Sequence, residues 1–145
     1  MRVQPAVDTF EFDIENNIYF VRADRELTLQ HYLGLYKEQS VRAVGKVIAR
    51  INAIKTVDNI EYEVEFGNLT GKLVKMIENI LNEYNLINDK HKFFFVDKFY
   101  ETDFKKTSPG GLQRSKIFDL TEVIGNDEIP KPESLAKLLK NLTWV

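Results

Sequence analysis

Two neighbouring apolar runs, residues 32–36 and 41–54, constrain the fold more than any other feature of the chain. The first run, YLGLY, is apolar on both faces, and the second mixes β-branched residues with basic residues at regular intervals. A short polar link at residues 37–40 separates them, which is the pattern of an antiparallel hairpin at the centre of a curved sheet. Gly34 and Gly45 fall inside these strands, where a missing side chain lets the backbone bend or another group approach closely.

The rest of the chain predicts one domain that mixes strands and helices. Alternating or continuous apolar residues predict a strand that begins at Val7 and ends near Asn16, and further strands at 18–21, 60–66, 93–100 and 115–120. Apolar residues at three- and four-residue spacing predict two helices, one over 72–86 and one starting at Glu133 or Ser134, and a long irregular link is expected at 101–114. We therefore expect an α+β fold, in which residues 1–145 form a single domain with a curved antiparallel β-barrel-like sheet flanked by two main helices.

Composition narrows the class of protein and of partner. Hydrophobic residues at 43% and charged residues at 29% are ordinary for a globular domain. The net charge of -2 argues against a uniformly basic nucleic-acid surface, so any such binding is expected to be local. The absence of cysteine excludes disulfides, thiolate zinc sites and cysteine nucleophiles. No apolar window approaches a membrane span, and we expect a cytoplasmic protein without a membrane partner.

The sequence gives little support for a metal site or for a catalytic serine activated by histidine. His31 and His91 are the two histidines, and neither has a second ligand at metal-binding spacing or a serine partner placed for nucleophilic catalysis. We therefore expect no metal and no cofactor. Glu61, Glu63 and Glu65 alternate along one strand, which is typical of an exposed, solubilising face. The chain is more readily interpreted as a binding domain than as an enzyme.

Residues 92–116 differ from the rest of the chain in charge and in aromatic content. This segment carries six basic and three acidic side chains, a net charge of +3, interleaved with six aromatic residues and a Gly-Gly pair. Basic side chains can contact phosphates, aromatic faces can stack on bases, and glycine amides permit close approach. The alternative is a solvated loop over a buried aromatic core, because strand aromatics are normally buried.

The central hairpin also carries a resemblance to a known family. The YLGLY run, a charged turn and then SVRAVGKVIARI, with Val44-Gly45-Lys46-Val47, resemble the middle of the PUA-like superfamily, in particular its EVE and ASCH branches. The resemblance implies a compact curved β barrel with flanking helices that reads RNA or modified bases in DNA, often attached to a nuclease or other effector. The chain lacks the early tryptophan of the EVE pattern, and Trp144 is assigned to packing of the terminal helix.

We predict a recognition module for nucleic acid or a nucleotide, as a domain of a larger defence or regulatory protein with an effector domain or protein partner. Its ligand is expected between the loop at 22–25, the rim of the central hairpin and the loop at 105–114. The predicted ligand-binding residues are Arg22, Asp24, Arg25, Tyr36, Tyr100, Lys105, Lys106, Gly110, Gly111 and Arg114. Two alternatives stay open: a protein-interaction or structural domain, and a nuclease-like acid/base enzyme that uses Asp24, Glu101 or Asp103 with Arg114 as an anion clamp.

Overall fold

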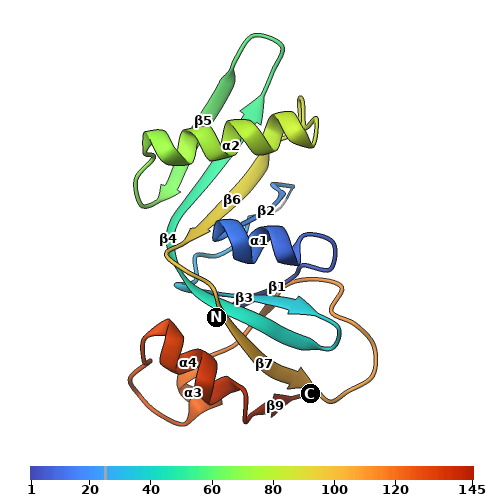
Figure 1. Ribbon diagram of the computed structural model, residues 1–145, viewed down its shortest axis with the longest axis vertical. Helices are drawn as coiled ribbons and strands as arrows, with labels where there is room; N and C mark the ends of the chain where they lie inside the picture. The colour runs from blue at the N-terminus through green and yellow to red at the C-terminus, as the bar shows by residue number, and fades with distance from the viewer. Residues whose placement is uncertain (25) are drawn as a thin grey trace. The chain divides into compact units, whose positions relative to one another are not determined.

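The computed structural model describes residues 1–24 and 26–145 and shows an α+β fold (Figure 1). Its strands are β1 (Arg2–Pro5), β2 (Ile18–Arg22), β3 (Tyr32–Lys37), β4 (Ser40–Lys55), β5 (Ile60–Phe66), β6 (His91–Val96), β7 (Tyr100–Lys106), β8 (Lys116–Ile117) and β9 (Thr143–Trp144). Its helices are α1 (Phe10–Asn16), α2 (Gly71–Glu83), α3 (Leu120–Ile124) and α4 (Pro132–Leu139). The α+β class is therefore confirmed, with two short helices, α1 and α3, beyond the two expected.

The described residues divide into two compact units. Unit 1 comprises residues 1–17, 30–47 and 96–145, and unit 2 comprises the described residues of 18–29 and 48–95. Strand β4 contributes its first half to unit 1 and its second half to unit 2. The expected single domain stays a prediction, and the two units are described separately below.

The sheet of unit 1 runs in the order β8-β1-β3-β4-β7-β9. It is mixed, because β1 lies parallel to β3 and β9 parallel to β7, so the antiparallel sheet expected from the sequence is wrong in these two pairs. No ladder joins β8 to β9 among the described strand pairs, so the barrel is not closed. Side chains contact each other there instead: the rings of Phe118 and Trp144 lie 5.1 Å apart, and the Nζ atom of Lys116 lies 5.2 Å from the Trp144 ring.

Helix α4 and strand β9 complete the core of unit 1. The helix begins at Pro132, whose missing N–H costs nothing at a first helical position, and it buries Leu135 and Leu139. Trp144 is not part of this helix: it belongs to β9, and its Nε1 atom donates a hydrogen bond to the carbonyl of Phe104 at 3.0 Å. The tryptophan is therefore a core residue that ties β9 to β7.

Unit 2 is a sheet in the order β2-β6-β4-β5 with α2 across it (Figure 1). The helix buries Ile77, Ile80 and Leu81, so the expected helix is confirmed, while Tyr84, at its C-cap, is 41% exposed. Thr70 caps its first turn by accepting a hydrogen bond from the amide of Leu73 at 3.3 Å. Gly67 precedes it with φ at +76°, and a Cβ there would lie 2.2 Å from the carbonyl oxygen of Ile48, so only glycine fits.

Three sequence-based element assignments are wrong. Residues 10–16 form a helix, although the alternation of apolar and polar residues at 7–12 predicts a strand. The buried residues, Phe10 and Asp13, are three positions apart, which is the spacing of a helix. Residues 100–106 form β7 and not a loop, because Thr102 and Phe104 face the core between charged neighbours. Of the expected last strand at 115–120, residues 116–117 form the short strand β8, and α3 begins at Leu120.

The central hairpin is confirmed, and it depends on Gly45. Leu33 pairs with Gly45 across β3 and β4, and the turn at Glu38 and Gln39 has positive φ at both residues. A Cβ built on Gly45 would lie 2.9 to 3.0 Å from the side chain of Val96, at the end of β6. Close approach of β6 to β4 therefore requires glycine at this position.

We predict that Gly45→Ala lowers the free energy of unfolding by about 1–3 kcal/mol, because the added methyl group overpacks against Val96. Gly111→Ala is the matched control, since no other atom lies within 4 Å of a Cβ built there. Chemical denaturation of both variants measures the difference. Equal midpoints for the two variants would contradict the close approach.

Candidate ligand-binding site

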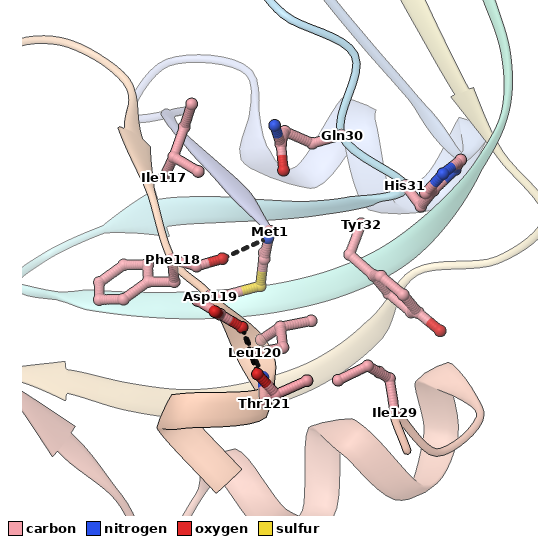
Figure 2. Close-up of a pocket in the computed structure, with 10 residues that line it drawn as sticks. All are labelled: Met1, Gln30, His31, Tyr32, Ile117, Phe118, Asp119, Leu120, Thr121 and Ile129. Atoms are coloured by element: carbon pink, nitrogen blue, oxygen red, sulfur yellow. Dashed lines mark hydrogen bonds between the residues drawn. The ribbon is translucent and has the colours of Figure 1, made fainter. Parts of the chain in front are cut away.

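Unit 1 contains a cavity of about 360 Å³ at the end of β3 (Figure 2). It is lined by Met1, Gln30, His31, Tyr32, Ile117, Phe118, Asp119, Leu120, Thr121 and Ile129. These residues come from the segment before β3, from the β8 to α3 connection and from the segment before α4. The volume and the mainly apolar lining match those of small-molecule sites in proteins.

The apolar wall of the cavity is held by both backbone and side-chain contacts. Met1 and Phe118 exchange two main-chain hydrogen bonds, at 2.7 and 2.8 Å, which fix the β8 side of the wall. Tyr32 and Ile129 pack against the buried core cluster of unit 1 and lie next to each other in Figure 2. Burial raises the pKa of the Tyr32 hydroxyl, which therefore stays protonated at neutral pH.

The polar part of the cavity centres on Asp119, the N-cap of α3. Its Oδ1 atom accepts hydrogen bonds from the amide of Thr121 at 3.0 Å and from the hydroxyl of Thr121 at 2.5 Å (Figure 2). These bonds hold the pKa of the carboxyl below its ordinary value, so Asp119 is ionised at neutral pH. Gln30 and His31 supply further polar groups at the cavity.

Lys46 on β4 and Tyr100 on β7 lie on the same sheet face as the cavity residue Tyr32. Tyr32 stands opposite Lys46, and Tyr100 stands opposite Val44, so these four side chains share one face of the sheet. Lys46 is exposed, and the Nζ atom of Lys98 lies 5.4 Å from the Tyr100 ring. We call Tyr32, Tyr100, Lys46 and Lys98 the tyrosine–lysine surface. It combines aromatic faces with accessible positive charge.

The predicted site residues in unit 2 do not belong to this cavity. Arg22 pairs with Asp89 at 3.2 Å, and Asp24 lines a different pocket within unit 2. Arg25 lies outside the described residues. Tyr36, in unit 1, is buried in the core with its ring 6.2 Å from the Trp144 ring, and its role as a ligand contact stays a prediction.

The predicted residues at the far end of β7 also fail to join Tyr100. Lys105 is five residues along β7, roughly 17 Å from Tyr100 at the rise of a strand, and lies 3.5 Å from Asp103. Lys106 donates from Nζ to the carbonyls of Ser108, Pro109 and Gly110 at 2.9 to 3.1 Å, so it holds its own loop together. Gly110, Gly111 and Arg114 are exposed in this region.

The acid/base alternative gains no support from Asp103. A hydrogen bond from Ser40 at 2.6 Å lowers the pKa of its carboxyl, and Lys105 and Arg42 act in the same direction against the opposing effect of burial. An ionised carboxylate in an ion-pair network is a poor general acid at neutral pH. Among the described residues, no group of three or more acidic or histidine side chains could hold a metal ion. No helix in this part of the chain is long and apolar enough to cross a membrane.

Unit 2 has a buried charge network that the sequence did not reveal. Lys92 and Arg50 are both buried and share one carboxylate, Glu65, and Lys92 also donates to Asn52 at 3.0 Å. Burial acts to raise the pKa of Glu65, but the hydrogen bonds and charges of Lys92 and Arg50 outweigh it and lower that pKa. The alternation on β5 predicts that Glu65 only makes an exposed face soluble, but the structure shows that it also neutralises two buried cations. It links β4, β5 and β6.

The cavity residues carried weak signals in the sequence. The sequence predicts Tyr32 to be a strand residue, and Gln30 and His31 to lie in the segment that leads into this strand. Asp119, followed by Thr121 and Glu122, does match the N-cap pattern of a helix start, and that pattern would have indicated α3. No family model, no curated protein and no solved structure matches this chain, so the site rests on its geometry.

Asp13 is buried on α1, and it makes stability depend on pH. Its Oδ2 atom accepts a hydrogen bond from Thr9 at 2.9 Å, but Oδ1 is buried without a partner. Burial raises the pKa of this carboxyl from 3.8 to about 7. The folded state therefore binds a proton that the unfolded state has released between about pH 4 and 7, and stability falls as pH rises through this range.

We predict that Asp13→Asn makes the protein more stable than the natural chain at pH 8, by up to about 4 kcal/mol, and changes little at pH 4. Asp8→Asn, at an exposed position, is the control and should shift nothing. Thermal melts at both pH values decide the matter. A gain that is equal at pH 4 and pH 8 would rule out ionisation of Asp13 as the cause.

Substitution of Lys106 should lower the free energy of unfolding more than substitution of its neighbour Lys105. Lys106→Met removes hydrogen bonds to the loop at 108–110 and should cost about 1–2 kcal/mol, while Lys105→Met, on an exposed side chain, should cost less than about 0.5. Thermal unfolding and limited proteolysis of the loop test this. Equal effects of the two variants would show that the Lys106 contacts carry no stability.

Proposed function

We propose that unit 1 recognises a nucleotide or an unpaired base of a single-stranded nucleic acid and takes the base ring into the cavity beside Tyr32. The observation that carries the proposal is the cavity itself, with an apolar wall, an aromatic ring and a small set of polar groups. A nucleobase has the matching chemistry, because its flat faces are apolar and its edges carry hydrogen-bond donors and acceptors. This combination supports recognition rather than catalysis.

The tyrosine–lysine surface supplies the groups that a phosphate and a neighbouring base require. Lys46 and Lys98 are exposed cations, and Tyr100 offers a second ring for stacking. Two accessible cations neutralise few phosphates, so we expect modest affinity that weakens only moderately with salt.

We also propose that unit 1 is an open variant of the PUA-like barrel. The support is the approach of β8 to β9 through Phe118, Lys116 and Trp144, which nearly completes the sheet without a hydrogen-bonded ladder. Attachment to an effector domain and a cytoplasmic location stay predictions.

A protein-interaction role is the second candidate, and the edge of unit 2 favours it. Strand β5 pairs only with β4 in the described part of the chain, and Val64 on it is 46% exposed. An unpaired strand edge can accept a strand from a partner. The charged residues on β5 are equally suited to preventing such pairing, so we rank this role below base recognition.

We predict that single-stranded oligonucleotides bind at low salt and that Lys46→Gln combined with Lys98→Gln lowers affinity. The logarithmic salt slope should fall by about 1.4, since each neutralised phosphate contributes about 0.7. Tyr32→Ala should lower affinity and leave that slope unchanged, because it removes stacking and not charge. Fluorescence anisotropy across salt concentrations measures both quantities.

The matched control is Lys137→Gln combined with Lys140→Gln, which makes the same charge change on exposed positions of unit 1 around α4. It should leave affinity and slope intact. A loss that appears only in Lys105→Gln combined with Arg114→Gln would move the site to the loop after β7. An absence of binding to every oligonucleotide and nucleotide would favour the protein-interaction role.

A further inference from the structure

The charge of the cavity limits which part of a nucleotide it can take. Among its ten lining residues, Asp119 is the carboxylate and no lysine or arginine is present. The other polar groups are Gln30, His31, Thr121, the Tyr32 hydroxyl and the Met1 amino group, whose pKa burial lowers to about 6. An ionised carboxylate repels phosphate and attracts hydrogen-bond donors. A base that enters this cavity is therefore selected by its donors.

The hydrogen bonds of Asp119 leave one of its oxygens available. Both hydrogen bonds from Thr121 end on Oδ1, which uses the two lone pairs of that atom. Neither bond from Thr121 ends on the Oδ2 atom, although the backbone amide of Glu122 also helps to lower the pKa of this carboxyl. Asp119 is exposed, so a ligand can reach this oxygen. Thr121 also orients the carboxylate, which reduces the entropy lost when a ligand binds.

The four bases differ in what they present to such an oxygen. Guanine carries a ring N1–H next to a 2-amino group, and these two donors converge on a single acceptor. Adenine and cytosine present one amino group beside a ring nitrogen whose lone pair would face the carboxylate. Uracil presents one N–H between two carbonyl oxygens. A carboxylate oxygen therefore binds the guanine edge with two attractive contacts and no repulsive one.

We propose that the unit 1 cavity prefers guanine and that Asp119 reads its N1–H and 2-amino group. The inference rests on the proposed function, because it assumes that a base occupies the cavity. It names a specificity that neither Tyr32 nor the lysines can supply, since stacking and phosphate contacts are insensitive to base identity.

The test is competition binding by the 5′-monophosphates of guanosine, inosine, adenosine, cytidine and uridine. Guanosine monophosphate should bind at least about tenfold more tightly than the adenosine, cytidine and uridine compounds. Inosine keeps N1–H and lacks the 2-amino group, so its affinity should fall between those of guanosine and adenosine. Oligouridine with one central guanosine, compared with the free nucleotide, distinguishes a strand from a mononucleotide as the source of the base.

Asp119→Asn separates base recognition from support of the fold. Asparagine caps helices about as well as aspartate, so the melting temperature should stay unchanged while the preference for guanine over adenine falls by about tenfold. Equal binding of all five nucleotides, or an equal loss for all of them in Asp119→Asn, would overturn the guanine assignment and leave base recognition standing. Failure of every nucleotide and oligonucleotide to bind would overturn both.

Discussion

The backbone pairing of β4 is the interaction on which the rest of the structure depends. This strand runs from Ser40 to Lys55 and pairs with β3 and β7 in unit 1 and with β5 and β6 in unit 2. Its ladder hydrogen bonds satisfy the main chain of a strand that is mostly buried. Gly45 permits Val96 to approach within van der Waals distance, so one absent side chain sets how closely β6 can lie.

Buried polar groups show where this packing has a cost. Lys92 and Arg50 are taken from water and share Glu65 as their acidic partner, so loss of that carboxylate would leave two buried charges poorly compensated. Asp13 avoids a similar cost by holding its proton up to about pH 7. Both devices keep the fold intact, and neither needs a ligand to explain it.

The candidate site follows from the strand order of unit 1. Pairing of β1 with both β3 and β8 brings Tyr32 and Phe118, far apart in sequence, to the same cavity. The N-cap of α3 then places an ionised carboxylate at its edge. The basic side chains of Lys46 and Lys98 lie outside the cavity lining. A base and a phosphate would therefore bind at different places in unit 1.

The sequence by itself determined the class and most local elements. The YLGLY hairpin, the alternation at 60–66 and the helical spacing from Leu73 to Leu81 were readable because each carries a regular run of apolar residues. In β3 and α2 these residues are largely buried, whereas in β5 they are only partly buried. The short elements were not readable, since α1 buries a carboxylate and β7 buries two residues between charged ones. Local periodicity is weak where so few residues are buried.

Only the tertiary structure decided the site. The expected ligand residues were chosen for charge, aromatic character and loop position, and the fold distributes them over two units and both ends of β7. Tyr36 and Lys106 show the physical reason: the first is buried in the core, and the second bonds to its own loop. Residue type tells what a side chain can bind, but strand register and packing determine which groups face one cavity and which are already satisfied by their neighbours.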